Sequence, residues 1–338
     1  MTIRHIAATA SFVVLLSTAS AHAQNEEGPP QKDRGVTSIV VENDLFGGAD
    51  RNYSNGLRLE RFAPAKRAHP WLRRAASWIP GVDIEQTEVR QGWGIAHAIF
   101  TPEDIEAPIP DPNDRPYAGW LHFSGTAVAT SRDKWDQHAI QINVGVVGES
   151  AGAEFVQTEF HKLIDGKEPR GWDAELSDEL GVELIAERLR RLRKTRVGPL
   201  EFDSAVFGGV TLGNVHTHAS LGAMVRAGFD LDADFGPPRI RPALGGSGAY
   251  NPSDPLGGYL FVGLEGRAVA RNIFLDGNTF VDGPRVDDRR DFVGDLQAGI
   301  ALNAGPTQVA FTYVHRTEQF VAQRGPDRFG AVSVSLAY

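Results

Sequence analysis

A strict alternation of apolar and polar residues, repeated along most of the chain, constrains its fold more than any other feature. From residue 37 onward, alternating segments rich in Val, Phe, Tyr, Thr and Gly are separated by loops of Asp, Asn, Pro and Gly. In one of them Leu296 and Ile300 share a face, whereas Asp295 and Asn303 share the opposite face. Twelve such segments are predicted as strands: 37–46, 53–65, 88–100, 116–131, 136–148, 178–193, 198–212, 214–229, 256–271, 289–303, 306–319 and 326–338.

The first residues have the layout of a cleavable export signal. Basic residues precede an apolar run, and the small-residue sequence AHA stands directly before Gln24. We therefore predict a signal peptide over 1–23, a short N-terminal lead-in over 24–36, and a single β-domain over 37–338.

Composition excludes several other classes of protein. No later segment reaches the ~18 consecutive apolar residues of a membrane-spanning helix. The chain has no Cys, so neither disulfides nor thiolate chemistry is available to it. Its formal net charge of −9 is spread along the sequence, which argues against a nucleic-acid partner.

The C-terminus separates a membrane barrel from a secreted β-sandwich, which would also alternate. The chain ends in AVSVSLAY, with Val332, Val334, Leu336 and the terminal Tyr338 on one face. This ending resembles the last strand of bacterial outer-membrane barrels, where the terminal aromatic is read by the barrel assembly machinery. In lipid, only closure of the sheet satisfies every backbone group. We therefore predict an all-β fold, a transmembrane antiparallel β-barrel of about 12 strands in the bacterial outer membrane.

One segment after the fifth predicted strand, residues 151–172, breaks the β pattern. Its apolar residues recur at helical spacing, and Gln157 and His161 lie one turn apart on another face. Both termini of an even-stranded outer-membrane barrel lie in the periplasm, so the connection after the fifth strand faces outward. The sequence therefore predicts a short helix in an extracellular loop.

Two connections on the predicted periplasmic side are unusually long. Outer-membrane barrels keep periplasmic turns short, yet 66–87 and 231–255 fall on that side and each exceeds 20 residues. The strand boundaries around these two stretches stay open on sequence alone.

Polar residues at the end of the first predicted strand are candidates for chemistry. Asn43 and Asp44 lie in VENDLFGGAD, and such a pair most often marks a strand that runs into an Asx-rich turn. Neighbouring strand residues point to opposite faces, so one of the two side chains faces the lipid side or its rim. A polar group there is costly and usually functional. The predicted loop helix with His161 lies on the same rim.

Four ordered motifs resemble those of a known family. They are NDLF at 43–46, DRNYSNG at 50–56, RPYAGWLH at 115–122, and Gln-x-x-x-His followed by GWDAEL at 157–176. In this order they resemble the outer-membrane lipid A 3′-O-deacylases of the LpxR type, from about residue 37 to the C-terminus. The resemblance implies a twelve-stranded barrel that removes the 3′-linked acyloxyacyl group of lipid A in lipopolysaccharide of the outer leaflet. It also implies Ca²⁺ as cofactor and an active site between the barrel wall and a loop helix.

The resemblance carries catalytic roles to Asn43, Asp44, Ser54, Gln157 and His161. Histidine is the residue type among these whose ordinary pKa lies near neutrality, so His161 is expected to be the general base that activates water. Gln157 would orient the histidine or the water. Asp44 would bind Ca²⁺, which prefers carboxylate and carbonyl oxygens and would polarise the ester. Asn43 and Ser54 would hydrogen-bond the oxyanion or hold the Asp44 loop. A second carboxylate could come from any of three acidic residues: Glu154, Asp165 and Glu168.

The segment RPYAGWLH has two interpretations. Tyr117, Trp120 and Phe123 fit an aromatic girdle at the upper membrane interface. Arg115 could bind a phosphate of lipid A, since a guanidinium pairs with phosphate through two hydrogen bonds.

Two other functions remain as alternatives. A serine-type outer-membrane phospholipase or esterase would use Ser54 as nucleophile, although the chain has no G-x-S-x-G elbow. A narrow porin-like barrel would have no enzymatic activity. In that case the lumen would be filled by inward polar residues: Glu265, Arg267, Arg271, Asp295 and Gln297. The sequence leaves the oligomeric state open.

Overall fold

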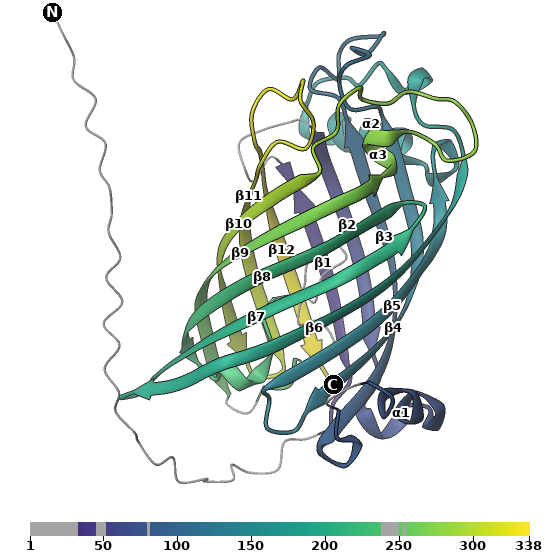
Figure 1. Ribbon diagram of the computed structural model, residues 1–338. Helices are drawn as coiled ribbons and strands as arrows, with labels where there is room; N and C mark the ends of the chain where they lie inside the picture. The colour runs from purple at the N-terminus through teal and green to yellow at the C-terminus, as the bar shows by residue number, and fades with distance from the viewer. Residues whose placement is uncertain (1–32, 45–51, 80–81, 238–249, 253–254) are drawn as a thin grey trace, which may run out of the picture. The chain divides into compact units, whose positions relative to one another are not determined.

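The computed structural model describes residues 33–44, 52–79, 82–237, 250–252 and 255–338, with the backbone alone described at 52–54. The predicted signal peptide and most of the lead-in lie outside the described residues. Within the described part, twelve strands form one closed antiparallel barrel (Figure 1). Each strand pairs with its neighbours in sequence, and β1 closes the sheet against β12. The all-β class and the strand count predicted from sequence are confirmed.

The strands of the barrel agree with the predicted segments to within a few residues. They are β1 (Val36–Asn43), β2 (Asn52–Phe62), β3 (Thr87–Thr101), β4 (Ala118–Ser131), β5 (Asp136–Val147), β6 (Glu179–Val197), β7 (Leu200–Gly213), β8 (His216–Phe229), β9 (Leu256–Asn272), β10 (Phe292–Ala304), β11 (Thr307–Arg316) and β12 (Asp327–Ala337).

Short helices occupy the connections. The α-helices are α1 (Pro70–Ala76), α2 (Ala153–Ile164) and α3 (Ile273–Asp276), and the 3₁₀ turns are η2 (Ala65–Arg67), η3 (Ile84–Gln86), η4 (Glu149–Ala151), η5 (Trp172–Ala174) and η6 (Leu231–Ala233). Across the described ranges, no helix is long and apolar enough to cross a membrane. α1 lies at the barrel end that carries the C-terminus, whereas α2 and α3 lie at the opposite end (Figure 1). In an outer-membrane barrel the first of these ends is periplasmic and the second extracellular.

Alternation along each strand sorts side chains between the lumen and the outer wall. On β1, Ser38, Val40 and Glu42 are buried in the lumen, while Ile39 faces outward and is half exposed. In the lumen, Arg267 and Arg316 both pair with Asp295, at 3.0 and 2.9 Å. The polar lumen network predicted from sequence is therefore present.

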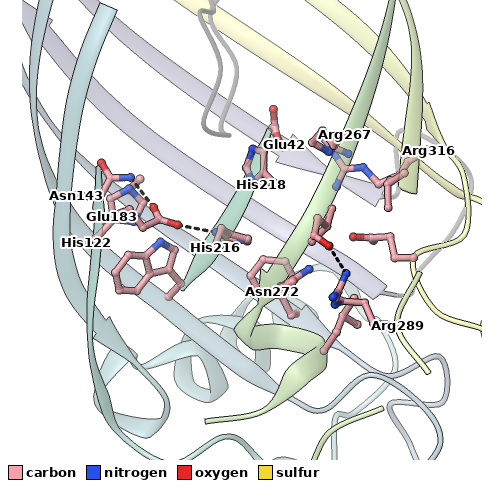
Figure 2. A pocket seen from close by; sticks show the side chains of 18 of the residues that line it. Glu42, His122, Asn143, Glu183, His216, His218, Arg267, Asn272, Arg289 and Arg316 are labelled. Carbon is pink, nitrogen blue, oxygen red and sulfur yellow. Dashed lines mark hydrogen bonds and ion pairs between the residues drawn. The ribbon is translucent and has the colours of Figure 1, made fainter. Parts of the chain in front are cut away.

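A cavity of about 120 Å³ lies within this polar network. At one side of it, the Nδ1 of His216 and the amide nitrogen of Asn143 both contact the carboxylate of Glu183, at 2.6 and 2.8 Å (Figure 2). These three groups come from β5, β6 and β8. Polar groups from three strands thus converge on one side of the lumen cavity at this level.

The described residues of the two long periplasmic connections contain no missed strand. The first, 63–86, holds η2, α1 and η3. The second begins with η6 and folds back into the lumen, where Asp234 pairs with Arg226 at 2.6 Å and accepts hydrogen bonds from Tyr259 and Gln308. The predicted strand boundaries on both sides of these connections therefore hold.

Aromatic residues close the extracellular end from inside. Trp120 is buried in a cluster with Phe274 of α3, and Phe100 stacks on Phe274 with ring centroids 3.9 Å apart. Tyr117 is also fully buried. The predicted aromatic girdle is therefore wrong for both residues, for different reasons. Trp120 faces the lumen, whereas Tyr117 lies on the outer side of the wall, where it is buried in a cluster with Ile99, Ala153 and Trp172. Phe123 alone of the three is exposed on the outer wall.

Candidate active site

α2 packs against the outer face of the barrel wall. Its first residue, Ala153, shares an apolar cluster with Ile99 of β3 and lies over Gly119 of β4. The approach is so close that a Cβ on Gly119 would lie 2.7 Å from the Cβ of Ala153. Gly119 is on the same strand face as the exposed Phe123, since the two are four residues apart. The helix therefore covers the lipid-facing side of the wall at its extracellular end.

Backbone conformations at both ends set the direction of α2. Gly152 precedes the helix with φ of 70°, in the left-handed region that glycine enters without steric cost. The helix ends at Asp165, also left-handed with φ of 54°, and the next amide, Gly166 N–H, donates to the carbonyl of His161 at 2.8 Å. These two left-handed residues change the direction of the chain immediately before and immediately after α2.

The buried side of α2 carries polar residues, and its exposed side carries large apolar side chains together with the charged Glu159 and Lys162. Ala153, Gln157 and His161 are its buried residues, and the latter two are 3% and 7% exposed. On the other side, Phe155 and Leu163 are 71% and 82% exposed. A surface helix of a soluble protein has the reverse arrangement. This helix therefore directs Gln157 and His161 at the barrel wall and leaves large apolar side chains exposed on its outer side.

Gln157 keeps a hydrogen-bond donor unused. The indole N–H of Trp172 donates to its Oε1 at 3.0 Å. An indole can only donate, so this bond fixes which end of the amide is oxygen and which is nitrogen. The Nε2 of Gln157 is buried and has no hydrogen-bond partner in the described part of the chain. A buried amide donor without a partner is costly, which makes it available to a bound oxygen atom.

The tautomer of His161 follows from a hydrogen bond of its ring. Its Nδ1 lies 2.5 Å from the carbonyl oxygen of Lys167. A carbonyl can only accept, so Nδ1 carries the proton and Nε2 holds the lone pair. The loop after α2 therefore orients the imidazole so that Nε2 is the basic nitrogen.

The sheet register places Asn43 in the same lateral row as the contact point of α2. Asn43 pairs with Asn55, Asn55 with Ile99, and Ile99 with Gly119. Residues directly opposite on neighbouring strands share a face, so Asn43 is on the outer wall. It is nevertheless only 6% exposed, and Asp44 beyond it is also buried. Asn43 therefore lies on the outer face, as expected for one of the pair, but it is covered there and not exposed to lipid.

The structure does not place the remaining predicted residues beside the buried side chains of α2. Ser54 lies in β2 at an irregularity between Tyr53 and Asn55, and its side chain is outside what the structure describes. Arg115 is 1% exposed, with its guanidinium over the ring of Phe100 at 5.5 Å. A guanidinium in this position does not reach the surface, so the structure gives no support to a phosphate contact. The three candidate second carboxylates are all exposed: Glu154, Asp165 and Glu168.

Glu175, an ionisable residue beside α2, was not among the site residues predicted from the sequence. Burial, together with the carboxylates of Glu149, Glu154 and Asp178, raises the pKa of Glu175 to about 7. Trp172 and the carbonyl of Lys167 were also missed as partners of the site. Trp172 stands in the GWDAEL motif, but nothing in a sequence marks which backbone carbonyl will meet an imidazole.

The oxygen donors at the end of β1 are of the type that a hard cation prefers, and the register separates them from Gly119 by three strand spacings. Asp44 supplies a buried carboxylate and Asn43 an amide oxygen at the same strand end. Within the described ranges, no group of three or more His, Cys, Asp or Glu residues could hold a metal ion. A cation at Asp44 would thus rely on backbone carbonyls and water for its other ligands, as Ca²⁺ does more readily than Zn²⁺.

The sequence profile described as "Outer membrane protein LpxR" matches residues 9–338. The chain belongs to the LpxR family. A solved structure, LpxR from Salmonella typhimurium, is similar to it with a TM-score of 0.74 and 19% sequence identity, covering 89% of this chain and 99% of that one. The beta domain of the Bordetella autotransporter BrkA has a TM-score of 0.43 at 11% identity, over 91% of this chain and 100% of the other. No curated protein matches. This LpxR-family chain is therefore an outer-membrane β-barrel, as its sequence predicts.

Proposed function

We propose that this LpxR-family barrel is a hydrolase that removes the 3′-linked acyloxyacyl group of lipid A in the outer leaflet. The observation that carries the proposal is the buried polar face of α2, pressed against the lipid-facing wall. It combines a histidine of fixed tautomer with an unused amide donor one helical turn away. An ester hydrolase needs both a base for water and a donor for the oxyanion.

The position of the site supports a membrane lipid as substrate. A soluble substrate would approach through the loops, whereas a lipid in the outer leaflet meets the outer wall directly. The exposed Phe155, Leu163 and Ile164 of α2 extend the apolar surface of the barrel beside the buried polar face. Acyl chains could lie along this apolar surface while the ester enters the gap between helix and wall.

The chemical steps follow from the two side chains. Nε2 of His161 takes a proton from water, and the oxygen of that water bonds to the carbonyl carbon of the ester. The resulting oxyanion accepts a hydrogen bond from Nε2 of Gln157. Collapse of the intermediate breaks the bond to the sugar oxygen, which takes the proton back from the imidazolium. Asn43 would add a second donor from the wall.

Asp44 is the residue we propose to hold Ca²⁺. When bound, the ion would polarise the ester carbonyl and stabilise the charge that develops on it. Ser54 would donate a hydrogen bond near the strand end, and the serine-nucleophile alternative gains nothing from the structure. The porin-like alternative would draw on the lumen ion pairs, such as those of Asp295, and gives no role to the buried polar residues of α2.

Purified protein acting on lipid A in detergent micelles with saturating Ca²⁺ tests the mechanism. His161→Ala is expected to lower the release of 3′ acyl groups by ~10²–10⁴-fold, because the base is lost. Lys162→Ala removes an exposed neighbour paired with Glu159 and should leave the rate unchanged. Ser54→Ala should cost less than His161→Ala. An inactive Ser54→Ala together with an acyl-enzyme trapped on the wild type would refute water activation.

A further inference from the structure

A groove of about 760 Å³ lies outside the barrel at its periplasmic end. The outer wall of β3–β5 forms its floor, and α1 forms one side through Trp71, Leu72 and Ala75. It exists because the connection after β2 is long enough to fold a helix back along the wall (Figure 1). The proposed deacylase site is at the opposite end of the same strands and uses none of these residues.

Packing and hydrogen bonds hold α1 in place against the wall. Ala76 forms a buried cluster with the outward-facing Val89 of β3 and Ala129 of β4. Upstream, the carboxylate of Asp33 accepts from the backbone N–H groups of Ala65 and Lys66 at 2.6 and 2.9 Å. Leu72 also packs against this cluster, and the groove lies beside these contacts, between α1 and the sheet.

The groove is continuous with the lipid-facing belt of the barrel. Its lining includes Trp93, Ile140, Ile142 and Leu184, all of which are exposed on the outer wall. In the membrane such residues contact acyl chains rather than water. An apolar groove that opens onto this belt at the membrane boundary is therefore filled from the bilayer.

Two arginine side chains, Arg61 and Arg67, line the end of the groove at the membrane surface. Arg61 donates from Nε to the hydroxyl of Tyr338 at 2.9 Å, and its guanidinium lies 4.9 Å from the centre of that ring. The side chain of Arg67 is exposed, and its guanidinium has no hydrogen-bond or ion-pair partner among the described residues. The exposed Trp71 and Trp78 on and beside α1 mark this level as the membrane interface.

We propose that this groove binds one glycerophospholipid of the periplasmic leaflet. An acyl chain lies between α1 and the wall of β3–β5, and the phosphate pairs with Arg61 and Arg67, since guanidinium groups bind phosphate oxygens through charge-assisted hydrogen bonds. The site is independent of the deacylase reaction, because its residues belong to the opposite end of the barrel.

Native mass spectrometry of the full barrel, folded in phosphatidylglycerol bilayers and extracted into detergent, tests this site. The wild type should retain one phosphatidylglycerol. Ala75→Trp fills the groove and should abolish retention, whereas Arg67→Ala should weaken phosphatidylglycerol binding by ~10-fold through loss of one charged partner. Arg74→Trp and Arg74→Ala are the matched controls, because Arg74 is exposed on the same helix and does not line the groove.

Each outcome decides for or against the site. A gel shift between boiled and unboiled samples confirms that every variant is folded, and Arg67→Ala, an exposed substitution, keeps the test valid if Ala75→Trp does not fold. Equal retention by Arg67→Ala and Arg74→Ala overturns the phosphate contact, and equal retention by Ala75→Trp and Arg74→Trp overturns the acyl-chain groove. Inorganic phosphate should not displace the lipid; full displacement would show an anion site without lipid specificity.

Discussion

At the scale of single residues, the chemistry of the site depends on hydrogen bonds that the sequence does not display. His161 and Gln157 could be named from the Gln-x-x-x-His motif. Their states follow only from the fold, since the Lys167 carbonyl fixes the proton on Nδ1 and Trp172 fixes the orientation of the amide. The sequence interpretation gave Gln157 the task of orienting water or histidine. The structure instead leaves its Nε2 as a buried donor without a described partner.

Gln157→Glu isolates that donor. A glutamate keeps an oxygen for the indole of Trp172 but cannot donate to an oxyanion when ionised. We expect the rate of deacylation to fall by ~10²–10³-fold, the usual cost of losing one oxyanion donor. Near-UV circular dichroism and the boiled-to-unboiled gel shift would check that the fold is kept. Activity equal to the wild type would remove Gln157 from oxyanion binding.

Asp44→Asn tests the proposed metal ligand. Loss of the carboxylate charge should raise the Ca²⁺ concentration needed for half-maximal activity, and a chelator should silence the wild type until Ca²⁺ is restored. Mg²⁺ should restore little, because it requires near-octahedral geometry and sheds water reluctantly. Asp111→Asn, in an exposed extracellular loop, is the matched control. Full activity in excess chelator would exclude the metal from the reaction.

At the scale of elements, the decisive feature is a helix laid against the outside of a sheet. The sequence predicts this helix and its place in an extracellular loop, and both expectations are confirmed. Its orientation could not be read from the pattern, because apolar periodicity normally marks the buried face of a helix. Here the surroundings of that face are lipid, so the polar face is the one that is buried.

Gly119→Ala should displace the helix without harming the barrel. The added methyl would lie 2.7 Å from the Cβ of Ala153 and 2.8 Å from that of Ala151. Because small displacements of catalytic groups are costly, we expect activity to fall by ~10–10²-fold. Gly125→Ala is the control on the same strand, where the nearest atom is 3.6 Å away, on Ile142. Equal activities of the two variants would show that the contact with Gly119 does not position α2.

The loop after α2 should be sensitive to pH through Glu175. Its pKa is raised to about 7 in the folded protein from the ordinary value of 4.5, so folding favours the protonated form. The stability this adds is complete below the ordinary pKa and is lost as the pH rises through about 7. Hydrogen exchange of 165–178 should therefore be faster at pH 8 than at pH 5 beyond the intrinsic change. Glu175→Gln should flatten that difference, and Glu168→Gln should not; an unaltered profile in Glu175→Gln contradicts the assignment.

At the scale of the whole molecule, the fold could be predicted almost completely from sequence, because alternation with period two is a local signal repeated in every strand. Closure of β1 on β12 followed from the need to satisfy backbone groups in lipid. The long periplasmic connections could not be resolved in the same way. One connection packs α1 on the outer wall, and the other inserts Asp234 among lumen residues. Neither arrangement produces a periodic pattern in the sequence.

The barrel thus carries two separate helix-covered regions on the lipid-facing side of β3 and β4, one toward each end. The extracellular region holds the candidate active site under α2, and the periplasmic region holds the groove beside α1. The candidate residues of both regions lie on the outer wall and not among the lumen ion pairs. The proposed function is therefore expected at the outer surface of the barrel, within the plane of the membrane.

Mass spectrometry of lipid A from bacteria that express the chain tests the central claim most directly. Cells with the wild type should yield lipid A lighter by the 3′ acyloxyacyl group. Cells with equal outer-membrane amounts of His161→Ala should yield unmodified lipid A. Unmodified lipid A from cells that contain correctly folded wild-type barrel, or the same lighter species from His161→Ala, would contradict a deacylase site between α2 and the barrel wall.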